Sequence, residues 1–259
     1  NEIVAGDEHR TLYEAVKAAP EKFGITAGFD YPIIISFTSA DENLSIQVHP
    51  TDEYAITHEN ALYGKSESWY FIEPPSEGWI YADSLIEDKR EIKRSILNGD
   101  YESVVGKIIV SKDDVVYIPS GTLHALTRGS LVYEIQQSTD ITYRFFDYNR
   151  LDNDGKLRDL HLDDAIETLN TENRVKSSAF PKDTLVSEQP YTMVRKTLEK
   201  VYHNTTDVAV AITVSKGSMC VDGHSILAGM SILVLPNETI SISQAAEEVV
   251  IATPKLYFK

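Results

Sequence analysis

Apolar and polar positions follow the two-residue period of β-strands along most of the chain, and helical periodicity is confined to a few segments. Strands are predicted at 32–38, 44–49 and 67–73, and from residue 107 onward short β-branched runs alternate with turn residues. Helices are predicted at three segments, 11–23, 84–98 and 162–170. The pattern therefore favours a mainly β protein with a few helices.

A break in this pattern predicts the domain organisation. Residues 171–190 are polar and include the Pro-containing runs FPKD and SEQP, which indicates a linker. A second β-rich set follows, with Gly and polar residues recurring about every 8–12 positions, as is typical of a sandwich or barrel. We predict two β-barrel halves, a first domain at 1–175 and a second at 176–259.

Composition and charge narrow the class of protein. The chain has 259 residues, 42% of them hydrophobic, which is enough for a hydrophobic core that needs no disulfide bonds or structural metal ions. A formal net charge of −16 argues against nucleic-acid and membrane partners, because both are anionic. The lone Cys220, the absence of a membrane-length apolar run and the absence of an apolar leader predict a cytoplasmic protein. The sequence gives no indication of oligomeric state.

The strand at 44–49 carries a pair of side chains that could bind a metal. Gln47 and His49 are two residues apart, so both point to the same face. An amide oxygen and an imidazole nitrogen are suitable ligands for a divalent cation. The competing interpretation is a hydrogen-bonded pair in the core.

Two further segments add candidate ligands. In DVVYIPSGTLH (114–124) a strand ends at Pro119, Gly121 permits a tight turn, and His124 opens the next strand. In GKSESWY (64–70) Lys65 and Glu67 share one strand face. The alternatives are that His124 has no ligand role and that Glu67 is a solvated carboxylate at the edge of a sheet. Together the segments supply Gln, His, Glu and His, a donor set that zinc accepts.

Four blocks in order, QVHPTDEYA, GKSESWY, YIPSGTLHAL and EIQQSTDITYRFFDYNR, resemble type I phosphomannose isomerases of the short bacterial form over about residues 2–175. The resemblance implies a cupin fold, with two jelly-roll barrels of which the second has no metal site. It implies interconversion of mannose 6-phosphate and fructose 6-phosphate, and one zinc ion per chain. The implied ligands are Gln47, His49, Glu67 and His124.

Aldose–ketose isomerisation moves a proton between two carbons through an enediol, so the site needs a base. Glu134 lies between the apolar Tyr133 and Ile135 and should point into a polar cavity, where it matches an active-site carboxylate of the family. Lys65 shares a face with Glu67 and could aid ring opening or move protons. The base could be Glu134, Lys65 or a metal-bound water.

The same resemblance places two arginines in the site. It implies that Arg144 is catalytic and that Arg150 stands where the family has a basic phosphate contact; guanidinium groups suit both roles. Surface salt bridges to Asp140, Asp147 or Asp152 are the alternative for both. We expect Asp140 to orient Arg144, and Ser45 to donate its hydroxyl to the substrate phosphate.

Two departures from the family leave other functions open. Ser36 stands where the family has a lysine that helps hold the phosphate, and the Trp-Gly-Gly turn expected in an N-terminal segment is absent from this sequence. One alternative is therefore a non-catalytic or divergent sugar-phosphate-binding cupin. Another is an iron oxygenase-type cupin, although such sites favour histidine-rich or facial-triad ligands and Gln47 argues against it.

Overall fold

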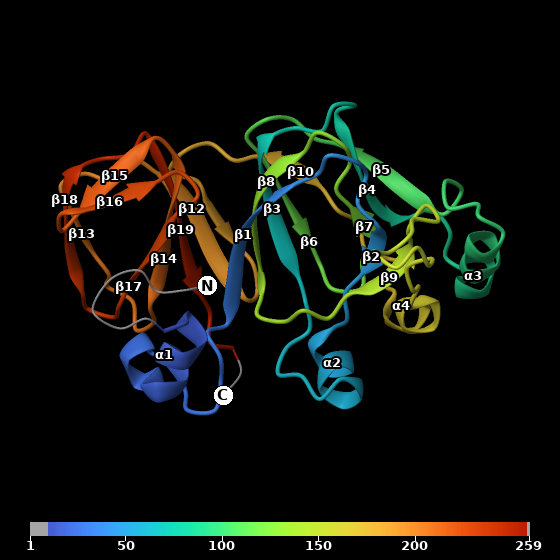
Figure 1. Ribbon diagram of the computed structural model, residues 1–259, viewed down its shortest axis with the longest axis horizontal. Helices are drawn as coiled ribbons and strands as arrows, with labels where there is room; N and C mark the ends of the chain where they lie inside the picture. Colours follow the sequence, from blue (N-terminus) through green and yellow to red (C-terminus); the bar gives the residue numbers. More distant parts are fainter. Residues whose placement is uncertain (1–9, 258–259) are drawn as a thin grey trace. The chain divides into compact units, whose positions relative to one another are not determined.

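The computed structural model describes residues 10–257, which divide into two compact units. The central unit runs from Ile34 to Phe180, and the terminal unit combines the described residues up to Ile33 with the described residues from Pro181 onward. Strands greatly outnumber helices in both units (Figure 1), which confirms the predicted mainly β class. No helix in residues 10–257 is long and apolar enough to span a bilayer.

Two five-stranded sheets build the central unit. Their strand orders are β1-β8-β3-β6-β10 and β5-β4-β7-β2-β9. The strands of the first sheet are β1 Ile33–Ser39, β3 Glu67–Glu73, β6 Asp114–Ile118, β8 Leu131–Gln137 and β10 Ser177–Ala179. The strands of the second sheet are β2 Ile46–Val48, β4 Trp79–Ser84, β5 Val105–Ile109, β7 His124–Ala125 and β9 Tyr143–Phe146.

Three helices complete the central unit: α2 (Asp52–His58), α3 (Lys89–Leu97) and α4 (Leu162–Thr168). Thr51 caps α2 by accepting from the Tyr54 N–H, and Asp88 caps α3 by accepting from the Arg90 N–H. Helix α3 buries Ile92 and Ile96, which lie one turn apart on its inner stripe. Helices α3 and α4 lie beside the sheet that contains β2 and β9 (Figure 1).

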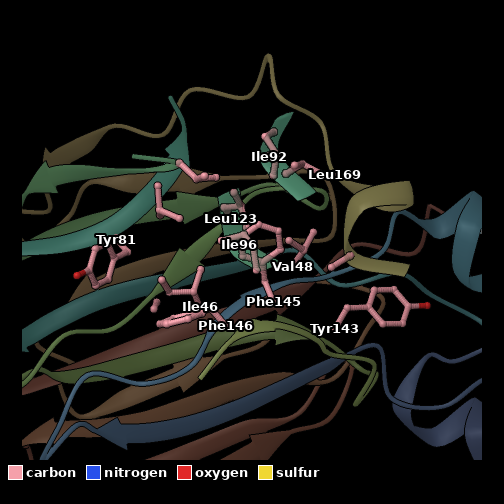
Figure 2. Packing of buried hydrophobic residues seen from close by; sticks show 14 residues of the cluster. Ile46, Val48, Tyr81, Ile92, Ile96, Leu123, Tyr143, Phe145, Phe146 and Leu169 are labelled. Atoms are coloured by element: carbon pink, nitrogen blue, oxygen red, sulfur yellow. The ribbon is translucent and has the colours of Figure 1, made fainter. Parts of the chain in front are cut away.

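Alternation along β2 separates a core face from a polar face. Ile46 and Val48 belong to a buried cluster with residues of β9, α3 and α4, among them Phe146 and Ile96 (Figure 2). Gln47 therefore faces the other way, toward the interior between the two sheets. Part of that interior is filled by a second cluster drawn from both sheets, including Trp69 from β3 and Ile80 from β4. Gln47, the polar residue of β2, thus points toward the inner face of β3.

The terminal unit contains two further sheets, of order β11-β12-β19-β14-β17 and β13-β18-β15-β16. Their apolar faces share one buried cluster, to which β14, β15, β18 and β19 all contribute. The unit also holds α1 (Leu12–Ala18) and a 3₁₀ helix (Pro20–Phe23). Its strands are β11 Leu185–Ser187, β12 Tyr191–Lys196, β13 Val201–His203, β14 Val210–Lys216, β15 Ser218–Val221, β16 His224–Leu227, β17 Ser231–Val234, β18 Thr239–Gln244 and β19 Glu248–Pro254.

The structure corrects two details of the predicted organisation. The segment 171–190 is not a plain linker, because it contains β10, which pairs with β6, and β11, which pairs with β12. The described residues before Ile34 group with the terminal unit, whereas the sequence interpretation placed them in the first domain. The break between the units at Phe180 and Pro181 lies within the predicted linker.

Candidate metal centre

The four predicted ligands lie on three neighbouring parts of the central unit. Gln47 is in β2 and pairs in register with His124 at the start of β7. His49 follows β2 directly, and Glu67 opens β3 in the facing sheet. One ligand atom from each of His49, Glu67 and His124 lies within 4.8 Å of the others. The structure therefore brings together side chains that are up to 77 positions apart in the chain.

The polar atoms of these side chains converge on one point. His49 Nε2 lies 3.5 Å from Glu67 Oε2, and His124 Nε2 lies 3.4 Å from Glu67 Oε1. The Gln47 amide completes the group, with Nε2 3.3 Å from His124 Nε2. The amide oxygen and nitrogen are both attached to Cδ of Gln47. A half-turn about the Cγ–Cδ bond exchanges their positions and would present the oxygen as a ligand.

Hydrogen bonds on the far side of each imidazole fix its orientation. His49 Nδ1 lies 3.0 Å from the Ile141 carbonyl oxygen, and His124 Nδ1 lies 2.8 Å from that of Thr122. A carbonyl oxygen can only accept, so both Nδ1 atoms carry the proton and both Nε2 atoms present a lone pair to the centre. Histidines that bind metals are typically held in this way.

The convergent atoms match a cation site. His49, Glu67 and His124 are all 1% exposed or less. Nevertheless, His49 Nε2 and both Glu67 carboxylate oxygens have no hydrogen-bond partner among residues 10–257. Buried acceptors without donors are costly, and a bound cation would satisfy them. Two imidazoles, a carboxylate and an amide form a donor set suited to a divalent metal such as zinc.

The protonation states favour metal binding. Burial lowers the pKa of His49 to about 4, and the charge of Lys65 acts in the same direction, so the ring is neutral near pH 7. Burial alone would raise the pKa of Glu67, but Lys65 and the two histidines outweigh it and hold that pKa well below its usual value. Lys65 Nζ lies 3.4 Å from Glu67 Oε2. Glu67 is therefore a carboxylate with a cationic neighbour.

Glu134 lies on β8, next to the β3 strand that carries Glu67. Its carboxylate accepts from the Thr38 hydroxyl at 2.5 Å and from the Ser36 hydroxyl at 3.3 Å. Burial raises the pKa of Glu134 to about 7, and the nearby charge of Glu67 adds to the effect. Glu134 can thus exist with or without its proton near neutral pH, as an acid–base group requires.

Sequence reasoning missed Thr38 and the network that supports Lys65. Thr38 lies two residues from Ser36 on β1, so strand alternation was the available signal for its position. Gln137 accepts from the Ser66 N–H and hydroxyl, both at 2.8 Å, and donates to Asp52 at 2.8 Å. These bonds fix the backbone between Lys65 and Glu67.

Arg144 pairs in register with Gln47 across β9 and β2, and the structure places it together with Arg150 beside Asp147. Arg144 donates from Nη1 to the Asp159 carbonyl at 2.7 Å, and Arg150 donates to Asp147 and to the Asn43 carbonyl. The guanidinium groups of both arginines lie near the carboxylate of Asp147. The carboxylate near Arg144 is that of Asp147, and Asp140, expected to orient this arginine, is exposed. Ser45, expected to contact phosphate, is partly buried just before β2.

Known proteins resemble the chain in sequence over part of its length. No protein-family model matches. Over 160 residues, 62% of this chain and 51% of the relative, it is 41% identical to a Bacillus subtilis protein named "Probable mannose-6-phosphate isomerase". It is 40% identical over 159 residues to a second Bacillus subtilis protein, named mannose-6-phosphate isomerase. The chain spans about half the length of these curated relatives.

Solved structures extend the resemblance to the fold. The crystal structure of mannose 6-phosphate isomerase from Bacillus subtilis superposes with a TM-score of 0.83 at 26% identity, covering 97% of this chain and 85% of that one. A phosphomannose isomerase mutant from Salmonella typhimurium gives a TM-score of 0.67 at 11% identity, which bears on the fold alone. The expected resemblance is confirmed: this chain is similar to mannose-6-phosphate isomerases in sequence over 62% of its length and in fold over 97%.

Proposed function

We propose that the chain is a zinc-dependent aldose–ketose isomerase that interconverts mannose 6-phosphate and fructose 6-phosphate. The observation that carries the proposal is the buried convergence of His49, Glu67 and His124, in which His49 Nε2 and both Glu67 oxygens lack hydrogen-bond partners among the described residues. The names of the relatives at about 40% identity support the same reaction and substrate. The small-molecule partner is accordingly a sugar phosphate.

Gln47, His49, Glu67 and His124 would hold the metal. When bound, zinc polarises oxygen atoms and stabilises negative charge that develops on them, without redox chemistry. Glu67 supplies the negative charge that the cation requires, and the carbonyls of Ile141 and Thr122 keep both imidazoles oriented. Metal affinity thus depends on groups one contact away from the centre as well as on the ligands.

Glu134 is the proposed base. Its carboxylate takes the proton from C2 of the aldose and returns it to C1, while the hydroxyl proton of O2 is transferred to O1, which converts the aldose into the ketose through an enediol. The Thr38 and Ser36 hydroxyls hold Glu134 in place during both transfers. Lys65, 8% exposed beside Glu67, is positioned to donate a proton to a substrate oxygen or to stabilise its negative charge. Its amine is the alternative base.

A non-catalytic sugar-phosphate binder is the second candidate. Ser36, which occupies the position of the family's phosphate-binding lysine, contacts Glu134 and brings no positive charge. Arg150 pairs with Asp147 and donates to the Asn43 carbonyl. A binder would keep the metal centre and show no turnover.

We place the protein in the cytoplasm, because its single cysteine requires no oxidising compartment.

The test combines metal analysis with an isomerase assay on the same preparation. Plasma mass spectrometry of the wild type should give one zinc per chain, and a coupled assay should detect fructose 6-phosphate formed from mannose 6-phosphate. His124→Ala should lose both, because it removes a ligand from a site with no spare. His58→Ala is the matched control, since this exposed histidine of α2 contacts Tyr54 and Thr57 and is not among the proposed ligands.

The two readouts separate the candidates. Zinc without turnover in the wild type would favour the sugar-phosphate binder. Stoichiometric zinc in His124→Ala would remove His124 from the ligand set and refute the site as assigned. Iron in place of zinc would favour the oxygenase-type alternative.

A further inference from the structure

The turn at residues 119–123, between β6 and β7, is bonded to two other segments of the metal centre. The Gly121 N–H donates to the carbonyl oxygen of His49, itself a proposed ligand, at 2.8 Å. The Ser120 hydroxyl donates to the carbonyl oxygen of Lys65 at 3.0 Å, just before β3 begins. Both bonds end on backbone carbonyls, so a shift of the turn would also shift the backbone on two sides of the metal centre.

The same turn orients a third part of the centre, the His124 imidazole. His124 Nδ1 donates to the Thr122 carbonyl at 2.8 Å, while Nε2 lies 3.4 Å from Glu67 Oε1. Thr122 is 1% exposed and His124 is fully buried, so solvent has little access to this bond. The position of the Thr122 carbonyl therefore determines the direction in which His124 presents its lone pair.

Asn173, which follows α4 in the chain, holds this turn through its side-chain amide. Its Nδ2 donates to the Ser120 carbonyl at 3.0 Å and to the Thr122 hydroxyl at 2.8 Å. One NH₂ group has two protons to donate, and here they bridge the residues on either side of Gly121. The bonds span 53 and 51 positions of the chain, so they are tertiary contacts and not part of the turn itself.

Neighbouring hydrogen bonds fix which way the Asn173 amide faces. The Glu172 N–H donates to Asn170 Oδ1 at 3.0 Å, so the NH₂ group of Asn170 is the one that faces Asn173. Asn170 Nδ2 donates to Asn173 Oδ1 at 2.9 Å, which directs Asn173 Nδ2 to the turn. The Asn170 N–H adds a bond to the Gly121 carbonyl at 2.8 Å. Asn173 is therefore held as a donor to the turn.

We propose that Asn173 is a positioning residue for the metal centre. Its amide fixes the turn, and the Thr122 carbonyl transmits this constraint to the His124 imidazole. The effect of Asn173 on zinc binding rests on the proposed function, whereas its effect on His124 does not. Loss of a group that orients a metal ligand lowers metal affinity about 10- to 100-fold. Asn173 acts on the residue that bonds the histidine, so we expect the lower end of this range.

Asn173→Asp is the most direct test, because a carboxylate oxygen would face the Ser120 carbonyl in place of an N–H donor. The variant keeps the size of the side chain and replaces a hydrogen bond by repulsion between two acceptors. Asn173→Ala removes both bonds without adding a charge, which separates loss of the amide from the effect of charge. Asn237→Asp is the matched control, since it makes the same change at an exposed position in the terminal unit.

Proton NMR of the isotope-labelled protein reports on His124 directly, whether or not the protein holds zinc. In the wild type and in Asn237→Asp, the Nδ1–H of His124 should give a slowly exchanging signal, assigned by its loss in His124→Ala. Both Asn173 variants should lose this signal, because the Thr122 carbonyl is no longer held in place. The signal of His49 should persist in them, because its partner is the Ile141 carbonyl, outside the turn.

Competition with a chelator on the same proteins measures the consequence for zinc. Both Asn173 variants should bind zinc about tenfold more weakly than the wild type, and Asn237→Asp should match the wild type. A wild type that binds no zinc, together with the expected loss of the His124 signal in the variants, would refute the proposed zinc function and support the positioning of His124.

Four results would overturn the proposal. The first is an unchanged His124 signal in Asn173→Asp and Asn173→Ala, once circular dichroism shows that they are folded, and the second is its absence from the wild type. The third is equal zinc affinity in the wild type and both variants. The fourth is equal loss of the His49 and His124 signals, or loss of folding in both variants, which would give Asn173 a structural role only.

Discussion

At the scale of residues, local sequence pattern predicted the proposed metal ligands but not the contacts that support them. Gln47 and His49 share a strand face whatever else the chain does, and the structure orients them accordingly. Thr38 could not be assigned in the same way, because its bond to Glu134 spans 96 positions and depends on which strands become neighbours. Asp147 was expected only as one possible salt-bridge partner of Arg144 and Arg150, and its further pairing with Arg158 depends on the fold.

Thr38→Val should impair turnover without loss of zinc. The substitution keeps the shape of the side chain but removes the hydroxyl that donates to Glu134 at 2.5 Å. A base held less firmly transfers protons more slowly, so we expect kcat to fall by about tenfold with little change in KM. Steady-state kinetics and zinc analysis measure the two effects, and Thr57→Val, in exposed α2, is the control. An unchanged kcat would show that Thr38 does not position the base.

At the scale of elements, strands with strong alternation were predicted well. The segment predicted at 67–73 is β3, and the helix expected at 84–98 exists as the shorter α3. Helix α2 was missed because only Ala55 of its residues is buried, so it lacks an apolar period. The short β10 and β11 were missed because their residues are mostly exposed and their pairing is non-local.

The turn before β7 gives a prediction about Gly121. Its φ is +78°, and a Cβ there would lie 2.9 Å from the Thr168 carbonyl oxygen. Gly121→Ala should therefore cost about 1–3 kcal/mol of unfolding free energy and weaken zinc binding by displacing His124. Gly78→Ala is the control, since Gly78 has a φ of +74° but open space around it. Urea denaturation and zinc titration compare them; equal zinc affinity in both variants would contradict the proposed coupling.

A buried ion pair in the central strands of the terminal unit gives a second prediction. Arg195 on β12 binds Glu248 on β19 at 2.6 Å, and each residue is 6% exposed. Glu248→Leu leaves a buried guanidinium without its carboxylate and should cost about 3–5 kcal/mol in chemical denaturation. The double variant Arg195→Met, Glu248→Leu should recover most of this loss. Glu247→Leu, which breaks an exposed pair with Lys216, should cost less than about 1 kcal/mol.

At the scale of the whole molecule, the mainly β class and the separation into two units followed from the periodic pattern and the polar stretch at 171–190. The sequence pattern did not predict that the described residues before Ile34 belong to the terminal unit, because packing with distant strands decides this. Every proposed metal ligand lies in the central unit.

Zinc should stabilise the folded protein, because the ligand cluster exists only in the native state. At about one hundred times its dissociation constant, a ligand that binds only the folded state adds about 2.7 kcal/mol, which corresponds to a rise in Tm of several degrees for a chain of this size. Differential scanning calorimetry with zinc and with a chelator measures the shift. His124→Ala should show none, whereas a shift equal to that of the wild type would mean that zinc acts elsewhere.

The most direct test of the central claim is an anomalous difference map from crystals of the purified protein, recorded on both sides of the zinc absorption edge. We predict one strong peak between His49 Nε2, His124 Nε2 and the Glu67 carboxylate, with the Gln47 amide oxygen turned toward it. A map without density at that point, or with zinc bound only at other residues, would contradict the account.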